Sequence, residues 1–220
     1  MSMKRLVIFD YDGTIADSRG SIAHCANLAL EAVGRPQVPA TMVQALIGLP
    51  LRDIFGRLLD DGGDDEILDG AVAAYRSRYA DVDRAHSRLY EQMPELLADL
   101  KRAGTMLAIA TGKSTEGAHR GISRHGLDAT LFDLVLGSDA VPRPKPYPDM
   151  VLVILDDLGV HPDDATVVGD TTFDIEMGVS ADVDACGVTW GSHGHDQLRH
   201  AGAKWIVQTR DELRRLLLQE

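Results

Sequence analysis

Two aspartates separated by a single residue, Asp10 and Asp12, follow a short apolar run near the start of the chain. The run, residues 6–9, is continuously hydrophobic, as expected of a strand that is buried on both faces. An Asp-Gly pair can also mark a hairpin turn, but no second strand follows directly here. Two carboxylates at the end of a buried strand repel each other and require a cation or a proton. The pair therefore indicates a functional site.

Polar side chains also follow three later apolar segments, namely Thr111 with Gly112, Lys145, and Asp170 with Asp174. The threonine and the glycine offer a hydroxyl and backbone N–H groups to an anion. Prolines on both sides of the lysine stiffen its loop, which favours a fixed cation over a solvated surface side chain. Either later aspartate alone could simply stabilise a helix N-terminus. Together with the first pair, however, they form an all-oxygen ligand set, which suits Mg²⁺.

The elements that must position these residues alternate along the chain between strand and helix patterns. This alternation predicts an α/β fold, a Rossmann-like parallel sheet with helices on both faces. Ligands of such sheets bind at the carboxyl ends of the strands, so the polar segments are expected to meet at one edge. The expected strands are residues 6–10, 106–110, 132–136, 165–168, 185–189 and 205–207, and the expected helices are 94–103, 116–125, 149–158, 173–179, 197–200 and 211–218.

Residues 17–86 interrupt this alternation, since they show helical patterns without a strand of comparable strength. Turn signals divide the segment into about four helices, and it is expected to form a separate all-helical domain inserted after the first strand. Residues 1–16 and 87–220 would then form the sheet domain. The expected helices of the insertion are residues 22–33, 40–47, 51–59 and 66–79.

Composition narrows the class of protein further. The 220 residues carry 22 Lys and Arg against 34 Asp and Glu, which gives a formal net charge of −12. Such an acidic chain is a poor nucleic-acid binder, and its apolar runs are shorter than the ~20 residues of a membrane span. Two widely spaced cysteines indicate buried thiols in a reducing compartment rather than a disulfide framework. We therefore expect a cytoplasmic monomer or homodimer without nucleic-acid or membrane partners.

Two further segments invite a functional interpretation that the sequence does not support. The Gly112-Lys113-Ser114 stretch lacks the earlier glycine of a phosphate-binding P-loop. Lys113 is therefore expected to be an exposed lysine at a helix start. His193 and His195 lie in a glycine-rich stretch without metal-site spacing, so they are expected to be loop residues.

The polar motifs, taken in order, resemble those of the haloacid dehalogenase-like hydrolases, particularly the phosphoglycolate phosphatase-like branch. The resemblance covers essentially the whole chain, and it implies that residues 17–86 form the helical cap of that family. A cap that closes over the substrate excludes bulk water and supplies specificity, with hinges expected at residues 14–18 and 81–88. The matching motifs are Asp10-x-Asp12-Gly-Thr14, Thr111-Gly112, Lys145 and Gly169-Asp170-x-x-x-Asp174.

The resemblance also implies a role for each motif in hydrolysis of a small phosphomonoester such as phosphoglycolate. Asp10 would be the nucleophile that forms an aspartyl-phosphate. Asp12 would protonate the leaving alcohol and then activate water. Thr111 and Gly112 would hold the phosphoryl oxygens, and Lys145 would balance their charge.

The same resemblance implies a bound Mg²⁺ that offsets repulsion between the nucleophile and the phosphate. Its expected ligands are Asp10, the backbone carbonyl of Asp12, and Asp170. Asp174 would contact the ion through a water molecule or would contact the ligands rather than the ion. Arg52, which follows a rigid turn in the insertion, could touch an anionic leaving group or could simply be an exposed arginine at a helix start.

Several alternatives remain open at this stage. A sugar phosphomutase, a pyrophosphatase or a nucleotidase of the same superfamily would share the core motifs. A phosphoacceptor domain without turnover is disfavoured by the helical insertion and by Asp12, which would speed loss of the phosphate. Asp12 also argues against a dehalogenase. The family's phosphonate hydrolases use a cap lysine, and residues 17–86 contain no lysine.

Overall fold

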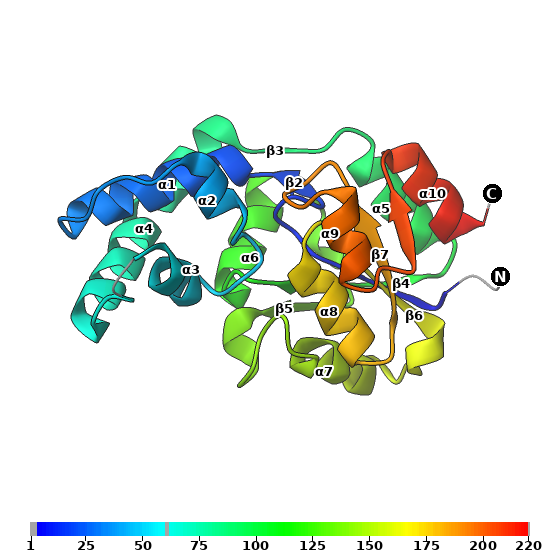
Figure 1. Cartoon of the computed structure of the whole chain (residues 1–220). Coiled ribbons are helices and arrows are strands. Elements are labelled where there is room, and N and C mark those ends of the chain that lie inside the picture. The colour runs from blue at the N-terminus through cyan, green and yellow to red at the C-terminus, as the bar shows by residue number, and fades with distance from the viewer. Residues whose placement is uncertain (1–3, 60–61, 220) are drawn as a thin grey trace.

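A six-stranded parallel sheet forms the centre of the protein (Figure 1), with strand order β5-β4-β1-β6-β7-β8. The computed structural model describes residues 4–59 and 62–219, so residues 1–3 and 220 of the expected core and residues 60–61 of the expected insertion lie outside it. The strands are β1 (Leu6–Phe9), β4 (Met106–Thr111), β5 (Leu134–Gly137), β6 (Ala165–Gly169), β7 (Asp184–Val188) and β8 (Trp205–Val207).

The register of the central strands brings the polar motifs to one edge of the sheet. Phe9, the last residue of β1, pairs with Ile109 of β4 and with Val168 of β6. The backbone N–H of Asp10 donates to the carbonyl of Val168 at 2.9 Å. The residues that follow β1, β4 and β6 therefore leave the sheet side by side.

Helices cover both faces of the sheet because the side chains of β1 alternate between two hydrophobic clusters. Val7 and Phe9 pack with residues of α5, α6 and α10, whereas Leu6 and Ile8 pack with residues of α7 and α8. This arrangement confirms the predicted fold class. The helices are α5 (Met93–Arg102), α6 (Thr115–Arg124), α7 (Asp149–Leu158), α8 (Thr172–Ser180), α9 (His195–His200) and α10 (Arg210–Leu218), with short 3-10 turns at Ala129–Leu131, Ser138–Ala140 and Pro162–Asp164.

A helical insertion, defined here as α1 to α4, lies to one side of the sheet in Figure 1 and has its own hydrophobic cluster. The chain enters and leaves it through a small antiparallel pair of strands, β2 (Ala16–Asp17) and β3 (Arg88–Leu89), close to the expected hinges. The helices of the insertion are α1 (Arg19–Ala32), α2 (Ala40–Gln44), α3 (Leu51–Leu58) and α4 (Asp65–His86).

Several element boundaries differ from those expected from the sequence. Helix α2 ends at Gln44 rather than at residue 47, because the chain passes into turns that lead to Gly48, whose φ is +104°. Helix α4 continues past residue 79 to His86, where the buried Asp83 forms an ion pair with Arg124 of α6. Strand β5 begins at Leu134 rather than at residue 132, since a 3-10 turn precedes it. None of the described helices combines the length and the apolar character needed to cross a membrane.

Candidate active site

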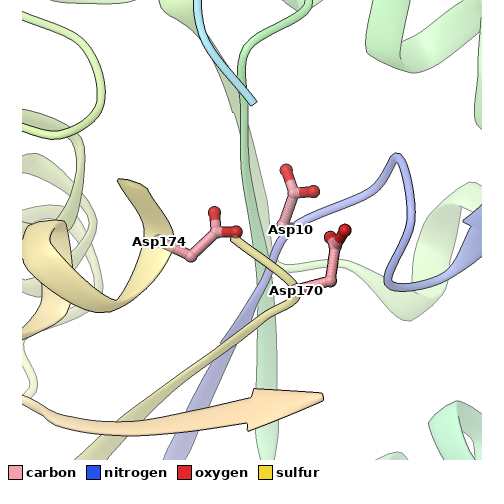
Figure 2. Close-up of side chains that lie close together, drawn as sticks. All are labelled: Asp10, Asp170 and Asp174. Carbon is pink, nitrogen blue, oxygen red and sulfur yellow. The ribbon is translucent and has the colours of Figure 1, made fainter. Parts of the chain in front are cut away.

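Three buried aspartates meet where β1 and β6 end. Asp10 follows β1, Asp170 follows β6, and Asp174 lies in the first turn of α8. One carboxylate oxygen from each lies within 4.8 Å of the others. Figure 2 shows the three side chains projecting toward the same side. This carboxylate cluster is the arrangement that the strand-end motifs predict.

Lys145 is fully buried beside the carboxylate cluster. Its ammonium group donates to Oδ1 of Asp10 at 2.7 Å and to Oδ1 of Asp174 at 2.5 Å. Burial of the amine lowers its pKa, but the two carboxylates outweigh this effect, so the net shift of the Lys145 pKa is upward. The lysine is therefore a fixed positive charge, as expected from its rigid loop.

The carboxylate cluster has more negative charge than Lys145 can offset. Burial, together with the neighbouring aspartates, raises the pKa of Asp10 well above its usual value despite Lys145. Burial and then Asp174 raise the pKa of Asp170 to about 7. Moreover, Oδ2 of Asp10 is buried and has no hydrogen-bond partner among residues 4–59 and 62–219. A cluster of buried acids whose negative charge exceeds that of one lysine fits a hard divalent cation, which takes oxygen ligands.

Asp170 is held in place by residues that are distant from it in the chain. The Thr14 hydroxyl donates to Oδ1 at 2.9 Å, and the Ser192 backbone N–H donates to Oδ2 at 2.7 Å. The backbone passes so close that a Cβ on Gly13 would lie 2.3 Å from Oδ2, and Gly13 has a φ of +90°. The Gly-Thr part of the first motif therefore helps to position Asp170 of the fourth motif.

Asp174 has two structural tasks. Its Oδ2 accepts from the backbone N–H of Thr171 at 3.0 Å and from the hydroxyl of Thr171 at 2.7 Å, which completes a capping box at the start of α8. Its Oδ1 accepts the hydrogen bond from Lys145. Helix capping and a place in the site, which the sequence leaves as alternatives, are thus combined in one side chain.

The carboxylate of Asp12 is not part of the carboxylate cluster and has its own partners. Ser18 donates to Oδ1 at 2.5 Å, and the ammonium group of Lys113 lies 2.9 Å from Oδ2. The side chain of Asp12 therefore lies outside the carboxylate cluster. Any contact of Asp12 with a metal would involve its backbone carbonyl, as the family resemblance implies. Lys113 was expected to be an exposed lysine, and that expectation is wrong, because its side chain is only 14% exposed.

Sequence reasoning could have found Lys113 from its position. It lies two residues after Thr111, at the same strand edge as the aspartates, and a lone cation there has acidic neighbours. Burial lowers the pKa of its amine, but Asp12 together with Tyr75 and Asp83 outweighs burial, and the net effect raises the pKa to about 12. The lysine also donates to the Tyr79 hydroxyl of α4 at 2.9 Å. Neither Ser18 nor Tyr79 carries a motif signal, so both were missed.

Thr111 and Gly112 lie where the helical insertion meets the sheet. Thr111 ends β4 and is buried, and its hydroxyl accepts from the backbone N–H of Lys113 at 3.3 Å. A Cβ on Gly112 would lie 2.5 Å from the carbonyl oxygen of Gly48 and 2.7 Å from that of Leu49. Only glycine therefore allows this approach of the insertion to the strand edge.

A cavity of about 340 Å³ lies between the sheet edge and the helical insertion. Asp10, Asp12, Thr111 and Gly112 form its floor, whereas Lys145, Asp170 and Asp174 are not part of the lining. The cavity therefore brings together the expected nucleophile, the expected acid–base residue and two of the three expected phosphate-binding residues. Asp170, Asp174 and Lys145 lie next to Asp10, outside the lining of the cavity.

Arg52 and the two histidines are placed elsewhere. Arg52 forms ion pairs with Asp65 and Asp69 within the insertion, and it does not line the cavity. His193, which was expected to be a loop residue, is buried and bridges the two parts of the molecule. Its Nδ1 accepts from the backbone N–H of Thr172 at 2.9 Å, and its Nε2 lies 3.1 Å from the carbonyl oxygen of Ala45. His195 begins α9.

The fold and the site define an α/β protein with acidic, hydroxyl and cationic groups converging at the ends of its strands. The chain belongs to the haloacid dehalogenase-like hydrolases, whose family model matches residues 7–188. It is 39% identical over 213 residues to "Probable phosphatase IndB" of Dickeya dadantii, covering 96% of this chain and 92% of the relative. It is 30% identical to "Phosphoglycolate phosphatase 1" of Pseudomonas aeruginosa, with 96% and 79% covered.

Solved structures show the same architecture. A predicted phosphoglycolate phosphatase from Haemophilus somnus superposes with a TM-score of 0.90 at 26% identity, and the match covers 100% of both chains. A predicted phosphatase from Clostridium acetobutylicum superposes with a TM-score of 0.89 at 27% identity, again over 100% of both chains. The family resemblance stated from the motifs is thereby confirmed.

Proposed function

We propose that this protein is a Mg²⁺-dependent phosphatase that hydrolyses a small phosphomonoester through an aspartyl-phosphate. The observation that carries the proposal is the state of Asp10. One of its carboxylate oxygens is held by Lys145, and the other is buried without a partner at the floor of the cavity. An oriented carboxylate with a free oxygen is a suitable nucleophile for phosphorus. The names of the relatives support the same chemistry.

In the first half of the reaction, Oδ2 of Asp10 attacks phosphorus and the bond between phosphorus and the ester oxygen breaks. The electron pair of that bond stays on the oxygen, which takes a proton from the protonated carboxyl of Asp12 and leaves as the alcohol. In the second half, Asp12 takes a proton from water as the water oxygen attacks phosphorus. The bond between phosphorus and Asp10 breaks, and inorganic phosphate is released.

The remaining site residues bind and balance charge. Thr111 and the backbone N–H of Gly112 hold phosphoryl oxygens. Lys145, which is paired with Asp10, offsets the negative charge of the phosphoryl group. Asp10, Asp170 and the carbonyl of Asp12 hold Mg²⁺, and Asp174 supports them. When bound, the ion supplies positive charge that reduces repulsion between the carboxylate and the phosphate.

The domain arrangement follows from the same proposal. Residues 1–16 and 87–220 form the catalytic core, and residues 17–86 form a cap whose hinges lie at β2 and β3. The tight approach of Gly112 to the loop at Gly48 supports this role, because it places the insertion directly over the phosphate-binding strand end. A cap in this position excludes water from the phosphoenzyme.

The test measures phosphate release from phosphoglycolate, sugar phosphates, nucleotides and pyrophosphate, with Mg²⁺ and with EDTA. Wild type should release phosphate only with Mg²⁺, and Asp10→Asn should release none. Asp184→Asn, which changes a surface aspartate paired with two lysines, serves as the matched control and should remain active. Release that persists in Asp10→Asn would refute the proposed nucleophile. A stable phosphoenzyme without turnover would favour a phosphoacceptor, and sugar-phosphate isomerisation without release would favour a mutase.

A further inference from the structure

The cavity extends well beyond the phosphate-binding floor, and its far wall is apolar. The helical insertion supplies that wall, and most of the side chains in it are buried. A phosphate bound near Asp10 would therefore have apolar side chains within reach of its ester group. The apolar lining residues are Ile22, Ile47, Leu49, Leu51, Ile54, Tyr75, Tyr79 and Ala80.

Two tyrosines give this wall a flat aromatic part. The rings of Tyr75 and Tyr79 are stacked, with centroids 5.1 Å apart and an interplanar angle of 17°. Phe55 packs edge-on against Tyr75 with a centroid separation of 6.2 Å, which fixes the stack from behind. The hydroxyl of Tyr79 donates to Asp83 at 3.0 Å and accepts from Lys113. With that hydroxyl already engaged, the ring of Tyr79 adds apolar surface to the cavity.

The cations that line the cavity are mostly already paired. Lys113 holds Asp12, Arg120 holds Glu116, and Arg124 holds Asp83. The fourth, Arg76, is exposed on α4. A carboxylate on the substrate in addition to the phosphate, such as that of phosphoglycolate, would have to compete with one of these pairs or reach the exposed arginine. Otherwise it would lie unpaired against the apolar wall, which is costly.

We propose that the natural substrate is a phosphomonoester whose alcohol carries an extended apolar body, alkyl or aryl, that fills the cavity against the insertion. The proposal rests on the phosphatase function argued above and specifies its substrate class. The phosphate lies over Asp10 and Thr111, and the apolar body lies along Ile54 and the stacked tyrosines. Phosphoglycolate, which has a single methylene group and a second negative charge, uses little of this wall.

A series of straight-chain alkyl phosphates from ethyl through butyl to hexyl tests this proposal, with phosphoglycolate as the reference. The leaving alcohols have nearly the same acidity, so the chemical step stays constant while the apolar length changes. Each methylene that becomes buried should raise kcat/KM by about fourfold until the cavity is full. Hexyl phosphate should therefore exceed both ethyl phosphate and phosphoglycolate.

Two variants on α3 connect the effect to the cavity wall. Ile54 and Leu58 are both 5% exposed, but only Ile54 lines the cavity. Ile54→Ala should lower the ratio of kcat/KM for hexyl phosphate to that for ethyl phosphate by about threefold or more, because apolar contact is lost. Leu58→Ala should leave that ratio unchanged. Since the ratio is measured within one variant, a loss of folded protein cancels.

The outcomes separate this inference from the phosphatase proposal. If phosphoglycolate and ethyl phosphate are hydrolysed but kcat/KM is flat or falls along the series, the apolar-substrate inference is overturned and the phosphatase function stands. An equal loss of ratio in Ile54→Ala and Leu58→Ala also overturns it. If no phosphomonoester is hydrolysed with Mg²⁺, both proposals fail together.

Discussion

The ammonium group of Lys113 lies 2.9 Å from Oδ2 of Asp12, the carboxylate proposed to move protons in the reaction. The same ammonium group donates to Tyr79 on α4, and Tyr79 in turn donates to Asp83, which is paired with Arg124 of α6. This polar chain runs from the core into the helical insertion and back. The orientation of Asp12 is therefore coupled to the position of α4.

Replacing Lys113 by methionine removes this coupling with little change in volume. Of the side-chain partners that the structure describes, Asp12 then keeps only Ser18, so its carboxylate is less well oriented for proton transfer. We expect kcat to fall by about 10- to 100-fold, within the range that positioned acid–base groups contribute. Steady-state kinetics with Mg²⁺ on a short alkyl phosphate measures this effect.

The matched control is Lys101→Met, which removes an ion pair with Asp133 at the surface, where both side chains are about 30% exposed. Its kcat should remain close to that of wild type. If Lys113→Met retains wild-type kcat with an unchanged melting temperature, the polar chain has no part in orienting Asp12.

Gly112→Ala tests the contact between the insertion and the strand edge. The new Cβ would lie 2.5 Å from the carbonyl oxygen of Gly48, and a backbone carbonyl cannot rotate away as a side chain could. The insertion must therefore move away from Thr111 and Gly112, the residues proposed to bind phosphate. Because small misplacements at a reacting centre are costly, we expect kcat/KM to fall by about tenfold to a hundredfold.

Gly56→Ala in α3 is the control for this substitution, because a Cβ there meets nothing within 4 Å. Alanine is the better helix former, so this variant should gain about 0.5–1 kcal/mol in the free energy of unfolding without loss of activity. Equal kinetics for the two alanine variants would show that the insertion tolerates displacement.

The strand-end aspartates could be placed from the sequence because parallel strands deliver their following residues to one edge. An apolar run followed by Asp10, and another followed by Asp170, therefore sufficed to predict a shared site. The same rule placed Thr111 beside them. Periodicity of apolar residues also predicted the insertion as helical, since its helices bury one face against a common cluster.

Contacts between the two parts of the molecule could not be predicted in this way. The bond from His193 to the carbonyl of Ala45 and that from Lys113 to Tyr79 join residues far apart in the chain. Such contacts depend on how the insertion sits on the sheet, which periodicity does not encode. For Arg52 the sequence left two possibilities, a contact with the leaving group and an exposed arginine at a helix start, and in the structure it is paired with acids of α4.

Lys145→Met tests the buried cation. Without the ammonium group, Asp10 and Asp174 remain as buried carboxylates with no compensating charge, so the free energy of unfolding at pH 8 should fall by about 3–5 kcal/mol. Lys204→Met is the control, because its ion pair with Asp184 is largely solvated and contributes at most about 1 kcal/mol. Urea unfolding of both variants measures the difference. Equal losses would mean that the carboxylate cluster does not depend on Lys145 for charge balance.

Asp170 makes the stability of the metal-free protein depend on pH. Its pKa in the folded state is about 7, against a usual value of 3.8, so the folded protein binds a proton more tightly than the unfolded chain does. The resulting stabilisation is fully present below pH 3.8, the usual pKa. It is lost as the pH rises through about 7, the pKa of Asp170 in the folded protein. Between about pH 5 and pH 8, the contribution of Asp170 to the free energy of unfolding should therefore decrease, by a few kcal/mol at most.

Mg²⁺ should reverse this loss, because it replaces the proton as the partner of the carboxylate. The rise in melting temperature on adding Mg²⁺ is therefore expected to be larger at pH 8 than at pH 5.5. Asp170→Asn, which cannot titrate, should show a flatter pH dependence without metal and a smaller effect of Mg²⁺ at pH 8. A Mg²⁺ effect that is equal at both pH values in wild type would exclude competition with a proton, and with it the place of Asp170 among the metal ligands.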